Sequence, residues 1–492
     1  MKPNRSVLLL ALALSSRLFA ADVPTPAPAP TPRPVVPASL TGTLFREGGA
    51  QLPAYPVLVR DEMPPVRAAR MKWFHDAHFG LFIHWGVYSV PAHGEWYMNN
   101  AKVPVATYKA FAKDFTAAKY DPQAWAALAK EAGVKYVVIT AKHHDGFTMY
   151  DSRYSDWNAV KAAAGRDLLQ PLADAVRAQG LKFGLYYSQS QDWINLGGGK
   201  GNTQPWDPEQ NKGSFDEYLK TIALPQIREI LDKYHPSYLF FDTEYSMTPE
   251  RARPIFDLTC KYPDLIINNR LGGGVLGDIG TPEQHIATDP FGRSFETCMT
   301  INNSWGYNAG DLRWKSAQQL IRNLSDIVSK GGNYLLNIGP TSEGLIPQPE
   351  VERLQAMGRW LKTNGEAVYG TEAGYYAEPL PWGRVTRKIQ PNGDTTLYLH
   401  VWNWPADGKV LLPGIQQSVR SGRLLAGGAA VTSTVTGAGL QVTLPGAATD
   451  PDVSVAALEF AGPVQFVNMA AASLDNGGAG TPADPSGGPA TR

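Results

Sequence analysis

The sequence predicts an α/β protein in which a (β/α)8-like, TIM-type barrel precedes a smaller antiparallel β-sandwich. Three observations support this fold class. Short apolar runs alternate with helical patterns from about residue 70 to 340, as in repeated βα units. No glycine-rich phosphate loop opens the first unit, which disfavours an open nucleotide-binding sheet. After about residue 372 the chain changes to short alternating segments separated by Gly, Pro, Asn and Asp, which is typical of a sandwich.

The N-terminus resembles a secretory signal peptide. Lys2 and Arg5 precede an apolar stretch that is too short to span a membrane, and small residues follow at Ala20 and Ala21. We therefore expect export to the periplasm or the medium. The predicted organisation is a signal peptide (1–21), a proline-rich linker (22–45), the catalytic barrel (46–371), the β-sandwich (372–463) and a disordered tail (464–492).

Seven apolar runs are the predicted barrel strands. Most are rich in β-branched or aromatic residues. They are apolar at both odd and even positions, as expected for parallel strands that are buried on both faces. They span residues 79–86, 135–144, 181–188, 237–244, 264–270, 296–304 and 332–340.

Helical patterns lie between several of these strands. One has Asp121 as its N-cap and Pro122 at its first helical position, and it ends at Gly133. A second ends at Gly180, and a third ends at the glycine pair 331–332. This alternation is typical of repeated βα units.

The composition excludes some classes of partner. Lys plus Arg equals Asp plus Glu, 45 each, so we expect no nucleic acid and no membrane partner after removal of the leader. Thirteen tryptophans and 21 tyrosines suit a ligand with apolar faces and many hydroxyls, or equally a large aromatic core. Cys260 and Cys298 are free or bridged, and we favour free, buried thiols.

Polar side chains follow almost every predicted strand. In a parallel barrel the carboxyl ends of the strands meet on one face, where active sites are built. One or two such endings would only terminate strands, but His, Tyr and Arg are not the usual loop formers. These residues are His84, His143, His144, Asp145, Tyr186, Tyr187, Ser188, Asp242, Asn269, Arg270, Asn302 and Asn303.

A metal site is not expected among these residues. His143 and His144 are adjacent, so in a strand they would point to opposite sides and would not easily share an ion. No HExxH motif or cysteine spacing typical of zinc occurs. Imidazoles that hydrogen-bond to ligand hydroxyls are the favoured interpretation, and histidines satisfied in a structural corner are the alternative.

Asp242 ends an apolar strand and shares a face with Phe240. A carboxylate in that position is costly unless it is used or paired, so catalysis and a salt bridge with Arg270 fit equally well. A glycosidase needs a second carboxylic acid across the cleft. The candidates in the following segment are Asp278, Glu283, Asp289 and Glu296.

Several motifs together resemble one enzyme family in their order along the chain. They are "WFHDAHFGLFIHWGVYSVPAHGEWY", "YVVITAKHHDGF", "GLKFGLYYS", "YLFFD", "SWGY" and "SKGGNYLLNIGP". From about residue 70 to 370 the chain is similar to the α-L-fucosidases of glycoside hydrolase family 29. The resemblance implies a catalytic barrel followed by a β-sandwich. It also implies exo-hydrolysis of terminal α-L-fucose with retention of configuration, through a covalent fucosyl-enzyme and without metal or cofactor.

The resemblance also implies roles for individual residues. Asp242 corresponds to the nucleophile, Tyr186 to a tyrosine near the anomeric centre, and Arg270 to an arginine beside the acid/base. An apolar pocket is expected for the 6-methyl group of fucose. The substrate-binding residues expected in addition are His84, Glu95, Trp96, His143, His144, Phe240 and Trp305.

The acid/base has two candidates. The "TPEQH" stretch matches the loop that carries it in many bacterial members, which favours Glu283. Glu296 is the alternative, and its other interpretation is a structural pairing with Arg270 or Arg293. Thr243 and Glu244 stand where many members carry a glycine, so an extra carboxylate is expected near the site.

The expected partners are fucosylated oligosaccharides or glycoconjugates, and self-association into a homo-oligomer is left open. Another exo-glycosidase such as an α-L-galactosidase would keep both carboxylates but change the aromatics at the methyl group. A non-catalytic fucose-binding protein would keep the histidines and aromatics but lose an acid, whereas this chain retains both.

Overall fold

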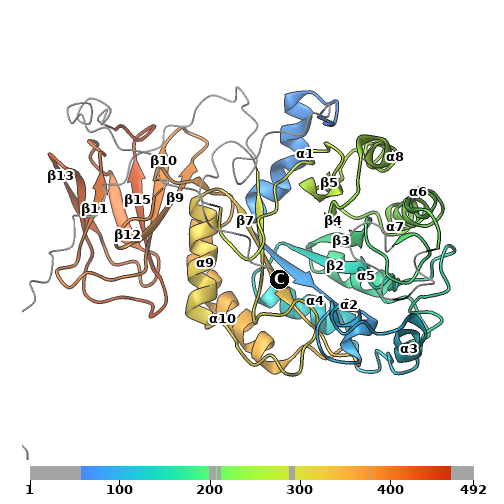
Figure 1. The fold of residues 1–492 in the computed structure, drawn as a ribbon. Helices are drawn as coiled ribbons and strands as arrows, with labels where there is room; N and C mark the ends of the chain where they lie inside the picture. Colours follow the sequence, from blue (N-terminus) through green and yellow to red (C-terminus); the bar gives the residue numbers. More distant parts are fainter. Residues whose placement is uncertain (1–56, 199–206, 208–211, 288–293, 377, 467–492) are drawn as a thin grey trace, which may run out of the picture.

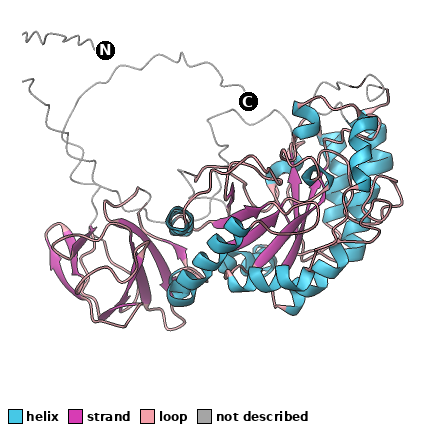
Figure 2. Ribbon diagram, turned by 90° about the horizontal axis from the view of Figure 1, so that it is seen from below, coloured by secondary structure: helices cyan, strands magenta, loops and turns pink. Residues whose placement is uncertain are grey.

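The computed structural model describes residues 57–198, 207, 212–287, 294–376 and 378–466. The predicted signal peptide and linker lie outside this part, as do residues 467–492 of the predicted tail. Figure 1 shows a barrel of strands and helices and, beside it, a separate group of β-strands, with α9 between them. In Figure 2 the helices surround the barrel strands.

Seven parallel strands form the curled sheet of the barrel, in the order β5-β4-β3-β2-β1-β7-β6. Each lies inside a predicted apolar run, and the predicted runs are longer because their polar endings leave the strand. The strands are β1 (Phe79–Ile83), β2 (Tyr136–Lys142), β3 (Lys182–Ser188), β4 (Tyr238–Asp242), β5 (Ile266–Ile267), β6 (Glu296–Thr300) and β7 (Asn333–Ile338).

An irregular segment, residues 278–284, occupies the space between the edge strands β5 and β6. Its first residue donates a backbone hydrogen bond to Ile267 at 2.7 Å, and its last donates one to Cys298 at 2.9 Å. Isolated parallel bridges join it to both strands. The segment "DIGTPEQ" contains Gly and Pro, which interrupt a regular ladder. It completes the barrel wall where an eighth strand would stand.

The longer helices that follow the strands pack on the outer face of the sheet, whereas α1 lies at the amino ends of the strands and α2 starts next to Trp96 at their carboxyl ends. In α4, Asp121 caps the helix by accepting a hydrogen bond from the Ala124 N–H, as predicted. The α-helices are α1 (Pro64–Ala77), α2 (Tyr97–Asn100), α3 (Val105–Lys109), α4 (Pro122–Glu131), α5 (Leu169–Ala178), α6 (Phe215–Tyr218), α7 (Leu224–Tyr234), α8 (Pro249–Thr259), α9 (Ala317–Ser329) and α10 (Gln348–Asn364). Short 3-10 helices are η1 (Val87–Ser89), η2 (Ala110–Lys113), η6 (Asn269–Leu271) and η7 (Gly365–Ala367), and η5 (Leu219–Ala223) is a π-helical turn.

Side chains alternate between two cores along each strand. In β4, Leu239 and Phe241 belong to the core between sheet and helices, whereas Tyr238 and Phe240 belong to the barrel interior. Phe74 of α1 packs against Tyr238 and closes the interior at the amino ends of the strands. Aromatic side chains therefore fill the described interior at the amino ends of the strands.

The C-terminal part is a β-sandwich of a five-stranded sheet, β12-β15-β10-β9-β8, and a three-stranded sheet, β11-β14-β13. All its pairings are antiparallel. The strands are β8 (Glu372–Ala373), β9 (Gly383–Ile389), β10 (Thr395–Val401), β11 (Lys409–Pro413), β12 (Ser421–Leu424), β13 (Thr432–Thr436), β14 (Gly439–Thr443) and β15 (Ser454–Phe460).

The sandwich is fixed to the barrel through α9 and α10. The Trp360 indole N–H donates to the Val453 carbonyl at 2.8 Å, and Arg384 pairs with Asp326 at 2.7 Å. Phe466 packs edge-on against Tyr375, with ring centroids 4.8 Å apart, so the packing of the sandwich continues three residues beyond its predicted end.

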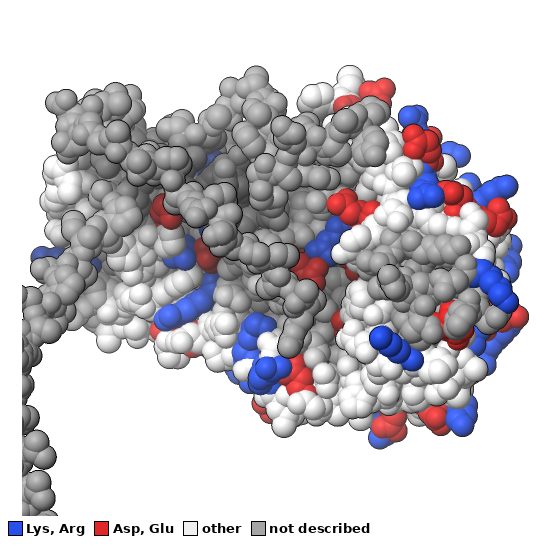
Figure 3. Space-filling model, viewed as in Figure 1, with Lys and Arg blue, Asp and Glu red and all other residues white. Residues whose placement is uncertain are grey.

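The two cysteines lie within the described residues and form no disulfide. Cys298 is buried and Cys260 is half-buried. Among the residues described, no helix combines the length and apolarity needed to cross a bilayer. Figure 3 shows acidic and basic side chains interspersed over one face, in keeping with the neutral composition.

Candidate active site

A pocket of about 410 Å³ opens at the carboxyl ends of the barrel strands. This volume falls within the ~300–1,000 Å³ common for ligand sites. Its described lining includes every predicted site residue except Glu296. The lining residues are Phe82, His84, Glu95, Trp96, His143, His144, Tyr186, Phe240, Asp242, Thr243, Glu244, Tyr245, Asn269, Arg270, Glu283, Cys298 and Trp305.

Asp242 is the last residue of β4, and its carboxylate is held from several sides. Oδ1 accepts hydrogen bonds from Arg270 Nη1 at 2.9 Å and from the Thr243 N–H at 2.8 Å. Oδ2 accepts one from the Tyr186 hydroxyl at 2.8 Å. Burial opposes ionisation, but the charge of Arg270 and the Tyr186 hydroxyl outweigh it, so the pKa of Asp242 lies below its usual value. Asp242 is an ionised carboxylate facing the pocket.

Glu283 stands across from Asp242 on the segment that closes the barrel. One of its carboxylate oxygens accepts a hydrogen bond from the same Arg270 Nη1, at 2.8 Å. The backbone bridge between Glu283 and Cys298 of β6 fixes its position, while its side chain keeps 42% of its surface exposed. A buried carboxylate and a half-exposed one therefore meet at one guanidinium.

Glu296, the alternative acid/base, lies elsewhere. It is the first residue of β6, at the amino end of the barrel, and accepts hydrogen bonds from the hydroxyls of Tyr136 and Tyr238. Burial raises the pKa of Glu296 to about 7, which would suit a general acid. It does not line the pocket, however, so the geometry disfavours that role. Of the expected pairings, Arg293 lies outside the described residues, and the hydrogen-bond partners of Glu296 are the two tyrosines.

Asp278 and Asp289 were the other two candidates for the second carboxylic acid. Asp278 forms a buried ion pair with Arg70 of α1 at 2.7 Å, which anchors the closing segment to the base of the barrel. Asp289 lies outside the described residues. Glu283 is thus the candidate that the structure brings beside Asp242.

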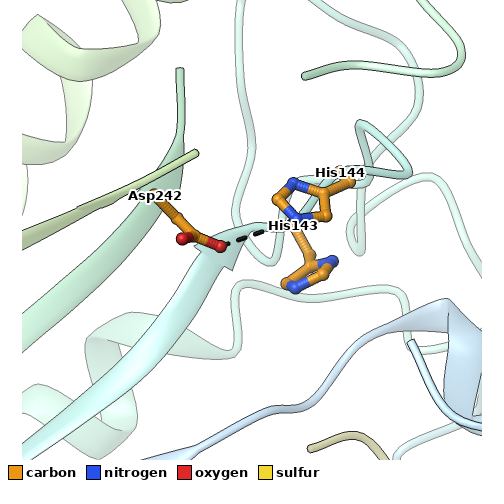
Figure 4. A group of neighbouring side chains, drawn as sticks. All are labelled: His143, His144 and Asp242. Atoms are coloured by element: carbon orange, nitrogen blue, oxygen red, sulfur yellow. Dashed lines mark ion pairs between the residues drawn. The ribbon is translucent and has the colours of Figure 1, made fainter. Parts of the chain in front are cut away.

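The prediction that His143 and His144 point to opposite sides is wrong. The pairing of β2 with β3 shifts register between Thr140 and Lys142, and β2 ends at Lys142, so strand alternation does not reach the histidines. Both rings line the pocket, with centroids 4.1 Å apart. Figure 4 shows the Asp242 carboxylate directed toward them, and the dashed line marks the 3.5 Å contact between His144 Nε2 and Asp242 Oδ2.

Because both rings face Asp242, these three residues could together be ligands of a metal ion. One ligand atom from each of His143, His144 and Asp242 lies within 4.8 Å of the others. The Asp242 carboxylate, however, already binds the Arg270 guanidinium, whose positive charge opposes a cation at this place. The donor set therefore fits a metal ion poorly.

Hydrogen bonds fix which nitrogen of each histidine faces the pocket contents. Asn337 donates to the Trp305 carbonyl at 2.7 Å, so its Oδ1 accepts from His84 Nδ1–H, also at 2.7 Å. Burial lowers the pKa of His84 to about 4, so the ring is neutral and its Nε2 is an acceptor.

His144 has the same arrangement. Ser188 Oγ donates to the Gln191 carbonyl at 2.9 Å and so accepts from His144 Nδ1–H at 2.7 Å. Burial lowers the pKa of His144 to about 4, which leaves its Nε2 as an acceptor beside Asp242. His143 stacks on Tyr186 with centroids 5.2 Å apart, and its buried Nδ1 has no hydrogen-bond partner. The rings of His84 and His144, which line the pocket, thus each carry an acceptor Nε2, and His143 beside them has one buried nitrogen without a partner.

Glu95 and Trp96 complete the polar wall. Glu95 Oε2 accepts a hydrogen bond from the Gly306 N–H at 2.7 Å, and burial raises the pKa of Glu95 to about 6. The Trp96 ring packs between His144 and Trp193, with centroid distances of 5.1 and 5.2 Å. These contacts hold Trp96 at the edge of the pocket.

An apolar wall faces these polar groups. Phe82 lies 5.0 Å from Phe240 and 6.0 Å from Trp305, measured between ring centroids. Phe82 and Cys298 also line the pocket and were not predicted as site residues from the sequence. Strand parity could have found Phe82, because it stands two residues before His84 and shares its side of the chain.

Two further residues missed by the sequence analysis position the catalytic candidates. Gln189 Oε1 accepts from the Asp242 N–H at 3.1 Å, while its Nε2 donates to the Arg270 carbonyl at 2.8 Å. Asn337 orients His84, as described above. Neither amide had a sequence signal beyond its place near a strand end.

The chain is similar to known proteins of one family. A sequence model described as "Alpha-L-fucosidase" matches residues 62–366. The human plasma alpha-L-fucosidase is 33% identical over 375 residues, which cover 69% of this chain and 78% of that protein.

Two solved structures of bacterial alpha-L-fucosidases are similar as well. Isoenzyme 1 from Paenibacillus thiaminolyticus is 36% identical with a TM-score of 0.72, covering 80% of this chain and 100% of that one. The Thermotoga maritima alpha-fucosidase in complex with fucose is 33% identical with a TM-score of 0.66, covering 79% and 96%. The chain therefore belongs to the α-L-fucosidase family of glycoside hydrolases.

Proposed function

We propose that this enzyme hydrolyses terminal α-L-fucosyl linkages by an exo-acting, retaining mechanism. The observation that carries the proposal is the shared Arg270 Nη1, which binds Asp242 and Glu283 at 2.9 and 2.8 Å. The two bound oxygens therefore lie at most about 5.7 Å apart, closer to the ~5–5.5 Å of retaining pairs than to the ~6.5–9.5 Å of inverting ones.

In the first step an oxygen of Asp242 attacks the anomeric carbon. The bond from that carbon to the leaving oxygen breaks, and the leaving oxygen takes a proton from Glu283. In the second step the Glu283 carboxylate removes a proton from water, the water oxygen bonds to the anomeric carbon, and the ester to Asp242 breaks. Oδ2 is the better placed nucleophile, because Oδ1 already accepts two hydrogen bonds and Oδ2 only one.

The acid role requires a movement of Glu283. Here its carboxylate oxygen is bound to Arg270 Nη1, whereas a general acid must reach the glycosidic oxygen. The Glu283 side chain is 42% exposed and is therefore less constrained by packing than Asp242, which is 14% exposed. We propose that Glu283 turns from Arg270 toward the glycosidic oxygen when a sugar fills the pocket.

The polar wall suits the hydroxyl groups of fucose. The Nε2 atoms of His84 and His144 accept hydrogen bonds from sugar hydroxyls, and the free nitrogen of His143 gains a partner. The second oxygen of Glu95 accepts a further hydroxyl. Each interaction satisfies a buried polar group, so binding of a polyol restores hydrogen bonds that burial otherwise costs.

The apolar wall suits the 6-methyl group. Phe82, Phe240 and Trp305 form an aromatic wall, against which a methyl group buries apolar surface, whereas a hydroxymethyl group would place a polar hydroxyl there at a cost. Such contacts contribute about 1–3 kcal/mol of discrimination between sugars. This wall favours fucose over L-galactose and so argues against the α-L-galactosidase alternative.

The proposed chemistry uses protein groups alone and needs neither metal nor cofactor. Its substrates are fucosylated oligosaccharides or glycoconjugates. Export to the periplasm or medium stays a prediction from residues 1–21, and self-association stays open.

The experiment that tests the proposal follows hydrolysis of an aryl α-L-fucoside by proton NMR, with aryl α-L-galactoside as the comparison. We expect α-L-fucose as the first product, with the β anomer appearing only by mutarotation, and slower turnover of the galactoside. If β-L-fucose appears first, the retaining mechanism is wrong. If neither glycoside is cleaved but fucose binds, the chain is a binding protein.

A further inference from the structure

The turn that follows β4 places two exposed residues at the outer part of the pocket. Glu244 and Tyr245 both line it, and Tyr245 keeps 52% of its surface exposed. Neither residue has a task in the cleavage chemistry or in the walls that surround the fucose ring. A half-exposed aromatic side chain beside a sugar pocket is available to a second sugar.

This turn is held on both sides. Thr243 adopts a left-handed backbone (φ 47°), and its carbonyl accepts hydrogen bonds from Ser190 Oγ and, at 3.3 Å, from Gln189 Nε2. The Ser246 carbonyl accepts from Arg251 Nη1 at 2.7 Å, and Met247 is buried beneath the turn. The two residues between these anchors are therefore presented on a constrained backbone, which lowers the entropy lost when a ligand packs on them.

The loop that contains Gly272 packs closely against this turn. At Gly272 (φ 81°) an added Cβ would lie 2.8 Å from the Cβ of Glu244. Only a residue without a side chain tolerates both this backbone and this contact. The loop thus supports Glu244 from below while its carboxylate remains exposed.

The charge around the pocket selects the ligand. Among the described lining residues there are four carboxylates, Glu95, Asp242, Glu244 and Glu283. The one cation among them, Arg270, is already bound by Asp242 and Glu283. An anionic group near Glu244 would meet repulsion without a counterion, whereas a neutral hydroxyl or amide N–H would find an acceptor.

We propose that Tyr245 and Glu244 form the subsite for the leaving-group sugar and that this subsite takes a neutral pyranose. The Tyr245 ring packs against the apolar face of that sugar, and Glu244 accepts a hydrogen bond from one of its hydroxyl or amide groups. This inference rests on the proposed fucosidase activity and specifies its substrate class: fucose linked to a neutral rather than a sulfated or sialylated unit.

The test compares two substrates that differ only beyond the glycosidic bond. α-L-Fucosyl fluoride has no leaving-group ring, whereas a neutral fucosyl disaccharide has one. For Tyr245→Ala we expect the ratio of kcat/KM, disaccharide over fluoride, to fall about tenfold, and for Tyr245→Phe to stay near wild type. Tyr154→Ala is the matched control, because Tyr154 is 40% exposed and does not line the pocket; its ratio should equal that of wild type.

The role of charge is tested with the same disaccharide carrying a sulfate on the leaving-group sugar. At low salt the wild-type enzyme should cleave the neutral disaccharide with a higher kcat/KM than the sulfated one. Glu244→Gln should reduce this preference by up to about tenfold, and added salt should reduce the gap between wild type and variant. An unchanged disaccharide-to-fluoride ratio in Tyr245→Ala, or an unchanged sulfate preference in Glu244→Gln, would overturn the subsite. If wild type cleaves neither fucosyl fluoride nor the disaccharide, the proposed function itself fails instead.

Discussion

The side chain of Gln189 accepts a hydrogen bond from the backbone N–H of Asp242 at 3.1 Å. Its amide nitrogen donates to the carbonyl of Arg270 at 2.8 Å. One buried glutamine on the loop after β3 therefore sets the spacing between the nucleophile candidate and the arginine that binds it.

Gln189→Ala should lower kcat by about tenfold or more with a smaller change in KM, because the nucleophile loses its alignment rather than its contact with sugar. Gln226→Ala is the control. Gln226 is equally buried but bonds to Tyr187 and Ser152 on the helix side of the sheet. Steady-state kinetics and thermal unfolding of both variants separate the roles: equal losses of kcat would show that Gln189 acts only through stability.

Glu283→Ala should lower turnover of fucosides with poor leaving groups by about 10²–10⁴-fold and spare those with activated aryl groups, which need little protonation. Glu296→Gln should keep the leaving-group dependence of wild type, because Glu296 lies at the opposite end of the barrel with Tyr136 and Tyr238. A series of aryl fucosides measures this. The assignment is reversed if the Glu296 variant is the selective one.

Phe82→Ala should reduce the preference for aryl α-L-fucoside over α-L-galactoside by about tenfold, because removing the ring makes room for a hydroxymethyl group. Leu81→Ala controls for loss of stability, since Leu81 is equally buried but faces the helices. A preference that survives in Phe82→Ala would show that other groups exclude the galactoside.

Glu350 gives a pH prediction that is independent of catalysis. Burial raises its pKa to about 8, countered in part by the Gly339 N–H. Between the unfolded pKa of about 4.5 and this value, the folded state binds the proton and the unfolded state does not, so stability falls as pH rises. Relative to Glu350→Gln, the wild-type free energy of unfolding should fall by on the order of 3 kcal/mol from about pH 5 to about pH 8.

Urea unfolding at both pH values measures this difference. Glu352→Gln is the control, because Glu352 is exposed on the same helix, α10. The same pH-dependent difference in the control variant, or none in Glu350→Gln, would contradict a protonated buried carboxyl.

The sequence predicted the barrel strands well because they are buried on both faces and therefore continuously apolar. It did not reveal the segment that takes the eighth position, because Gly280 and Pro282 remove the strand pattern there and hydrogen bonds from neighbouring strands hold it instead. Glu283 was proposed from a motif, and its opposition to Asp242 depends on this closing segment.

The site was predicted unevenly for similar reasons. Most lining residues follow strands and share parity, so Asp242, Tyr186 and Arg270 could be grouped from the sequence. The directions of His143 and His144 could not, since a register shift in β2 is a property of pairing rather than of composition. Likewise, Glu296 remained an alternative acid/base from the sequence, and only the arrangement of strands places it at the base of the barrel, where it bonds to Tyr136 and Tyr238.

The central claim is that Asp242 forms a covalent bond to the anomeric carbon. Its most direct test is incubation of the wild-type enzyme with a 2-deoxy-2-fluoro-L-fucosyl fluoride, which slows hydrolysis of the intermediate, followed by peptide mass spectrometry. We expect a single fluorofucosyl label on Asp242. A label on Glu283 or on another residue would contradict this role of Asp242. So would hydrolysis of the fluoride with no loss of activity and no covalent adduct.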